Sequence, residues 1–166
     1  MNRRSSGSLK TIATAEADFR SNDRDNDGAE NYWVRDVYGL FALCPRGETV
    51  DASHMIKLVE PSLASADAGR PQGYAGLVAP VDAIGSYSPR AGYVYAMIPR
   101  DADGRPYDDG TGHGVHFAVC SYPVSPSAGQ HTFIMDDTIT IWRKRVDGPV
   151  QQWPRDLRAE GWERVD

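Results

Sequence analysis

Three carboxylates, Asp23, Asp25 and Asp27, stand on alternate residues directly before Gly28 in the stretch DRDNDG. Calcium takes about six to eight oxygen ligands, and carboxylates on alternate residues of a tight turn can converge on one point. Glycine permits a sharp bend, which would direct the following carbonyl, that of Ala29, toward the same ion. The spacing favours a calcium loop. A solvated acidic turn is the alternative, because Asp, Asn and Gly are also the commonest turn residues.

The far end of this loop departs from the EF-hand pattern. An EF-hand carries a bidentate Glu at its twelfth position, where this chain has Val34. Glu30, Asn31 and Asp36 are the nearest side chains with suitable chemistry, and Asp36 is well placed to close over the loop. The predicted calcium ligands are therefore Asp23, Asp25, Asp27, Ala29, Asp36 and Glu30.

A second pattern, GHGVH, suggests a transition metal instead. His113 and His116 carry imidazoles, which are frequent zinc ligands, and Asp108 or Asp109 lies close enough in sequence to assist. Residues three apart on a strand point to opposite faces, so both histidines reach one ion only if Gly114 breaks the strand. The acidic stretch before them, residues 101–109, is better explained as a hairpin connection.

The chain lacks the common signatures of catalysis. It has no Gly-x-Ser-x-Gly elbow, no phosphate-binding loop and no dinucleotide fingerprint. Cys44 and Cys120 are too far apart in sequence for a CxxC motif, and the sequence leaves open whether they form a disulfide or remain two buried thiols. We therefore expect a protein that is not an enzyme, with no catalytic residues and no organic cofactor.

Composition narrows the class of protein further. The 166 residues are 40% hydrophobic, enough for one domain with its own core. The net charge is −5 and the only tight basic cluster is Arg143 to Arg145, which disfavours nucleic-acid binding. No run of about 18 apolar residues is present, and the opening MNRRSSGS has no apolar signal-peptide core.

The sequence predicts helices in the first half of the chain and strands in the second half, and these elements must position the candidate ligands. Apolar residues at helical spacing predict a helix over 8–20, after a disordered segment 1–7. Further short helices are expected over 33–43, over 53–60 up to Pro61, and near 62–67, before a Gly- and Pro-rich crossing. Alternating stretches predict an antiparallel sheet within 92–146, with a tight hairpin turn at Asp136 and Asp137. A tail over 147–166 should dock through Trp153 and Trp162. This order is typical of a single α+β domain with a helix packed on the sheet.

Several stretches resemble a known family. The segment SLKTIATAEADFRSNDRDNDGAENYWVRDVYGLFAL is similar to the region after the membrane helix in pilin-like, or pseudopilin-like, proteins of planctomycetes and related bacteria. The similarity continues, in the same order, through IKLVEPSLASAD, GYVYAMI, FAVCSYPVSPSAGQHTFIMDDTITIWRKRVDG and VQQWP. The last part also resembles an uncharacterised family of bacterial envelope proteins.

The resemblance implies a type IV pilin-like fold and a structural role in a pilus or a type II secretion filament, with calcium stabilising the domain. The implied partners are other pilin-like subunits, in homo- or hetero-assembly, and the implied location is the periplasm or cell surface, anchored to the inner membrane. The leader and apolar helix of a working pilin are missing, and MNRR stands in their place. A periplasmic or surface ligand-binding module that uses the Gly-rich crossing and the tyrosines is the alternative, and a metal-dependent hydrolase built on His113 and His116 is a third.

Overall fold

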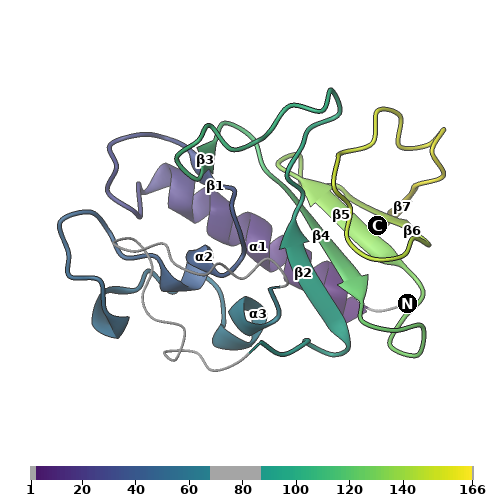
Figure 1. The fold of residues 1–166 in the computed structure, drawn as a ribbon, viewed down its shortest axis with the longest axis horizontal. Coiled ribbons are helices and arrows are strands. Elements are labelled where there is room, and N and C mark those ends of the chain that lie inside the picture. The colour runs from purple at the N-terminus through teal and green to yellow at the C-terminus, as the bar shows by residue number, and fades with distance from the viewer. Residues whose placement is uncertain (1–2, 68–86, 166) are drawn as a thin grey trace.

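The protein is described by a computed structural model that covers residues 3–67 and 87–165. A long helix, α1 (Arg3–Ser21), lies across one face of a five-stranded antiparallel sheet, and shorter elements pack beside it (Figure 1). The prediction of an α+β fold is confirmed. The predicted crossing between α3 and β2 lies largely outside the described residues.

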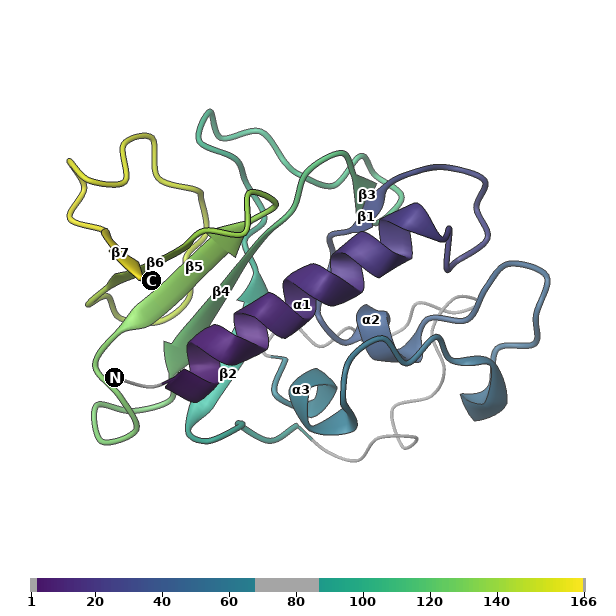
Figure 2. The same cartoon turned by 180° about the vertical axis from the view of Figure 1, so that it is seen from behind.

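Helix α1 begins earlier than the sequence pattern predicts. Residues 3–7 are helical, whereas we expected residues 1–7 to be disordered. The reason is that Ser5 and Ser8 are buried against the domain together with Leu9 and Ile12, so this end of the helix is held by packing. Figure 2 shows α1 crossing the sheet, with its C-terminal end beside β1 and β3.

The sheet contains β2 (Tyr93–Met97), β4 (Ala118–Pro123), β5 (Thr132–Asp136), β6 (Ile141–Lys144) and β7 (Glu163–Val165), in that spatial order and all antiparallel. A tight turn after Asp136 joins β5 to β6, as the sequence predicts. The fifth strand, β7, comes from the tail, which was expected only to dock on the surface.

Side chains alternate between the two faces of the sheet, as a pleated strand requires. Val119, Phe133 and Met135 belong to the main core together with α1. Ala118, Cys120 and Ile134 belong to a second cluster on the other face, which the tail covers with Trp162. The sheet is therefore buried on both faces, by α1 on one side and by the tail on the other.

The first half of the chain contains less helix than predicted. It forms β1 (Tyr32–Trp33), α2 (Gly39–Ala42), a 3-10 turn (Ala52–His54) and α3 (Pro61–Ser65). Trp33 was expected in a helix but lies in β1, which pairs with β3 (His113–Gly114). Pro61 was expected to end a helix and instead begins α3, because the first helical position needs no N–H donor.

Candidate metal centre

The acidic loop after α1 is held by its own first carboxylate. The backbone bends sharply at Asp23 and Asn26, which have φ of 46° and 55°, values that Asp and Asn tolerate better than most residues. Asp23 then accepts hydrogen bonds from the backbone N–H groups of Asp27, at 3.1 Å, and Gly28, at 3.0 Å. Asp23 therefore closes the turn, and its oxygens are occupied within the loop.

Asp25 and Asp27 meet a histidine that is distant in the sequence. The Nε2 atom of His113 lies 2.6 Å from Oδ2 of Asp25 and 3.5 Å from Oδ2 of Asp27. One potential ligand atom from each of these three side chains lies within 4.8 Å of the others. The three side chains are 92–95% buried. We call this group the Asp25–Asp27–His113 cluster.

Strand pairing and aromatic packing deliver His113 to the loop. The two-residue ladder between β1 and β3 places His113 opposite Trp33, whose ring meets the imidazole edge to face at 5.5 Å. The ring of Phe19, from the last turns of α1, stacks with the same imidazole at 6.2 Å between ring centroids. His113 is thus held between α1 and β1, although 88 residues separate it from Asp25.

Each side chain of the cluster except Asp25 has further partners that fix its position. Asp27 accepts from the backbone N–H of Ala29 at 2.8 Å and from the side-chain amide of Asn31 at 3.2 Å. The Nδ1 atom of His113 lies 2.9 Å from the hydroxyl of Thr111. In Asp25, by contrast, the buried Oδ1 atom has no hydrogen-bond partner among the described residues.

The electrostatics of the cluster favour charged side chains. Burial alone lowers the pKa of His113, but the hydrogen bond with Asp25 and the charges of Asp25, Asp27 and Asp109 outweigh it and raise that pKa. Burial raises the pKa of Asp27, but its hydrogen bonds from Ala29 and Asn31, together with the charge of His113, lower that pKa overall. The histidine therefore acts as the counter-ion of two carboxylates.

The structure does not bring the other predicted ligands to this point. Ala29 takes part through its N–H group, which binds Asp27. The Glu30 side chain is 78% exposed and lies 3.9 Å from Arg20. Asp36, expected to close the loop, instead accepts from the indole N–H of Trp33 and the backbone N–H of Gly39. In place of Asp36 and Glu30, the structure puts His113 beside Asp25 and Asp27.

Asp36 belongs to a second buried group of acids. It lies near Glu16 of α1, whose side chain is fully buried in the main core. Burial raises the pKa of Glu16 well above its usual value, and the negative charge of Asp36 adds a smaller increase. A hydrogen bond with the backbone of Trp33 acts in the opposite direction and offsets part of this rise. Burial in the core therefore favours the neutral form of the Glu16 carboxyl group.

The two histidines considered for a hydrolase, His113 and His116, are separated in the structure. His116 is exposed and its Nδ1 atom pairs with Asp137 at 2.6 Å, away from His113. Asp108 pairs with Arg35 at 3.2 Å and accepts backbone N–H groups of its own loop. Cys44 and Cys120 are both buried, and neither forms a disulfide.

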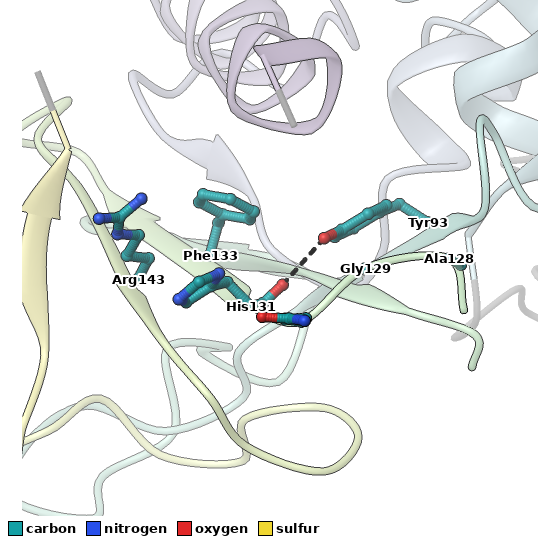
Figure 3. A pocket seen from close by; sticks show the side chains of 7 residues that line it. Tyr93, Ala128, Gly129, His131, Phe133 and Arg143 are labelled. Carbon is teal, nitrogen blue, oxygen red and sulfur yellow. Dashed lines mark hydrogen bonds between the residues drawn. The ribbon is translucent and has the colours of Figure 1, made fainter. Parts of the chain in front are cut away.

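A cavity on the α1 side of the sheet is a further feature that could hold a ligand. It has a volume of about 450 Å³ and is lined by Tyr93, Ala128, Gly129, Gln130, His131, Phe133 and Arg143 (Figure 3). The Tyr93 hydroxyl donates to the carbonyl oxygen of His131 at 3.2 Å. Burial and the nearby charges of Arg143 and Arg145 lower the pKa of His131.

Comparisons with known proteins add no relatives. No protein-family model, curated protein or solved structure matches this chain. Within the described residues, neither α1 nor any other helix is both long and apolar enough to cross a membrane. The site must therefore be interpreted from its own geometry.

Proposed function

We propose that this chain is the globular domain of a pilin-like or pseudopilin-like subunit of the bacterial envelope, with a structural role and no enzymatic activity. One observation carries the proposal: a 19-residue helix, α1, packs along one face of an antiparallel sheet. This is the arrangement that the sequence resemblance implies. In this role the domain is anchored through a preceding apolar segment and assembles with other pilin-like subunits.

The outward face of α1 supports an assembly role. It exposes short or polar residues along several turns, namely Gly7, Lys10, Thr11, Thr14 and Ala17. Small side chains let two helices approach closely, as they do between helices in membranes. The opposite face of α1 is buried against its own domain. The outward face can therefore contact a second subunit while the domain stays folded.

Disulfide cross-linking in the cells that produce the protein tests this role. Thr14→Cys places a thiol on the exposed face of α1, and Ala159→Cys places one on the exposed tail across the sheet. Native Cys44 and Cys120 are 2% and 0% exposed and give little background. We expect oxidised envelope fractions to contain cross-linked species for Thr14→Cys and few for Ala159→Cys. Equal cross-linking of the two variants, or absence of the protein from the envelope fraction, would refute the role.

A ligand-binding module is the second candidate, and the cavity beside β5 and β6 favours it. Its aromatic walls, Tyr93 and Phe133, together with the guanidinium of Arg143, suit a small organic anion. Thermal-shift measurements with a panel of small carboxylates and phosphates test this candidate. We expect any stabilising ligand to lose its effect in Arg143→Gln, and a panel without a stabilising ligand removes the candidate.

A further inference from the structure

We propose that Asp25, Asp27 and His113 form a binding site for one divalent transition-metal ion of the zinc class. The first observation is that three potential ligands from two distant segments converge with their ligand atoms within 4.8 Å. The second is that Oδ1 of Asp25 is buried and has no hydrogen-bond donor among the described residues. A buried polar atom without a partner is costly, and a cation is one way to satisfy it. This inference is independent of filament assembly.

The imidazole of His113 is oriented as a metal ligand would be. The hydroxyl of Thr111 donates its single hydrogen to Asp109 at 2.6 Å. Its oxygen is therefore left to accept from Nδ1–H of His113 at 2.9 Å. This relay fixes the hydrogen on Nδ1 and directs Nε2 at Asp25 and Asp27. Metal-binding histidines are commonly held by such a second hydrogen bond on the nitrogen that faces away from the ion.

The spacing of the ligand atoms suits a small ion. Nε2 of His113 and Oδ2 of Asp27 are 3.5 Å apart, close to the roughly 3.4 Å between two tetrahedral ligands at bond lengths of about 2.1 Å. The 2.6 Å contact with Asp25 is that of a hydrogen bond. Metal binding therefore requires Nε2 of His113 to release the hydrogen of that bond to solvent, and the Asp25 carboxylate to turn and present an oxygen to the ion in place of that contact.

The donor set favours a transition metal over calcium. Calcium requires about six to eight oxygens. This cluster offers the Nε2 atom of His113 and the oxygens of only two carboxylates, those of Asp25 and Asp27. Asp23 is committed to backbone N–H groups of the loop. Imidazole combined with carboxylate oxygens is typical of zinc and its neighbours. A divalent ion also balances the two carboxylate charges, which the single positive charge of an imidazolium does not.

An ion at this position would join three parts of the fold. Asp25 and Asp27 lie in the loop that leaves α1, and His113 lies in β3, which pairs with β1. The Asp25 backbone is further tied to the loop after Cys44, because its carbonyl accepts from the N–H of Arg46 at 2.8 Å. The burial of the three side chains leaves little access for a substrate, so the role inferred for the ion is structural.

Titration calorimetry on the purified chain, stripped of metal with a chelator, tests the inference with zinc and calcium as separate probes. We expect one zinc ion per chain, binding at least tenfold more tightly than calcium, and a rise in melting temperature with zinc. His113→Gln and Asp25→Asn should each weaken zinc binding at least tenfold. His116→Gln is the matched control, because His116 makes a carboxylate contact of the same 2.6 Å length on the surface, and it should bind zinc as the unmodified chain does.

A measurement on the unmodified protein keeps the test decisive if a variant fails to fold. Cobalt titrated into the chain should give the visible absorption of a protein-bound, low-coordinate ion, and zinc should shift the ring signals of His113 in NMR spectra while leaving those of His116 unchanged. Three results overturn the inference. These are the absence of stoichiometric zinc binding, tighter binding of calcium than of zinc, and zinc binding that persists in His113→Gln. The first of these would identify the cluster as a metal-free ion pair, and none of them bears on cross-linking through α1.

Discussion

Gly114 lies where β3 passes closest to the loop that precedes it, and Gly114→Ala should destabilise the fold strongly. A Cβ atom at this position would lie 2.3 Å from the carbonyl oxygen of Tyr107 and 3.1 Å from that of His116. Real Cβ atoms almost never approach other atoms within 3.0 Å. Both neighbours are backbone atoms, so neither can rotate away, and the strand must move by roughly 0.7 Å or more.

The expected cost follows from this clash. Forced insertion of one carbon into a packed region typically costs about 1–3 kcal/mol, and a clash with backbone belongs at the upper end, near 3 kcal/mol. Since about 1.4 kcal/mol corresponds to a factor of ten, the folding equilibrium constant should fall roughly a hundredfold. For a chain of this size the melting temperature should drop by about 6–12 °C. Urea and thermal unfolding of the purified protein measure both quantities.

Two other glycines provide matched controls. At Gly28 an added Cβ meets nothing within 4 Å, but the backbone has φ of +82°, so Gly28→Ala should cost only about 1 kcal/mol of conformational strain. Gly7 lies exposed within α1 with nothing within 4 Å, and Gly7→Ala should stabilise the fold by about 0.5–1 kcal/mol through helix propensity. If Gly114→Ala costs no more than Gly28→Ala, the steric reasoning is wrong.

Three further predictions concern buried groups. The pKa of Glu16 is raised in the folded state, so the contribution of Glu16 to stability is complete below the usual value of 4.5 and is lost as the pH rises through the raised value. Glu16→Gln should remove this contribution to the pH dependence of unfolding curves. Asp36→Ala removes the carboxylate that accepts from the indole N–H of Trp33 and from the backbone N–H of Gly39, and should cost about 2–6 kcal/mol in urea unfolding, at about 1–3 kcal/mol per buried donor. Burial raises the pKa of the Cys120 thiol to about 11, and Cys44 is also buried and in no disulfide. A thiol reagent at pH 8 should therefore label neither cysteine in the folded protein and both in guanidinium, whereas labelling of neither in guanidinium would show a disulfide.

Much of the sheet could be predicted from local pattern. Residues such as Val119 and Phe133 alternate with Ala118 and Ile134 because successive side chains of a strand point to opposite faces. Both sets are apolar because the sheet is buried on both faces, and such apolar runs are visible in the sequence. The start of α1 was not visible, because small serines face the core there and a serine also reads as a helix cap. Strand β7 was missed as well, since three residues in a turn-rich tail carry no readable period.

The candidate site was only half predictable, for a physical reason. The carboxylates of Asp25 and Asp27 share a short loop, so their proximity follows from spacing alone. His113 reaches them through a two-residue pairing of β1 with β3, too short to leave a pattern in the sequence. Asp36 was the better candidate by sequence distance, but two buried N–H donors hold it elsewhere. Proximity in sequence thus favoured Asp36, whose carboxylate binds two other N–H groups in the folded protein.

The positive φ angles of the loop explain why the evenly spaced Asp23, Asp25 and Asp27 have different binding partners. Alternate residues share one side only in an extended backbone, and the left-handed bends at Asp23 and Asn26 break that regularity. The first bend turns the Asp23 carboxylate back onto the loop's own N–H groups, whereas Asp25 and Asp27 remain directed at His113. The loop is thus formed by hydrogen bonds that need no ion.

An ion whose free concentration is 100 times its dissociation constant adds about 2.7 kcal/mol of stability to a fold that already exists. Its removal should therefore lower the melting temperature without unfolding the domain, unlike in zinc fingers, which are unfolded without their metal.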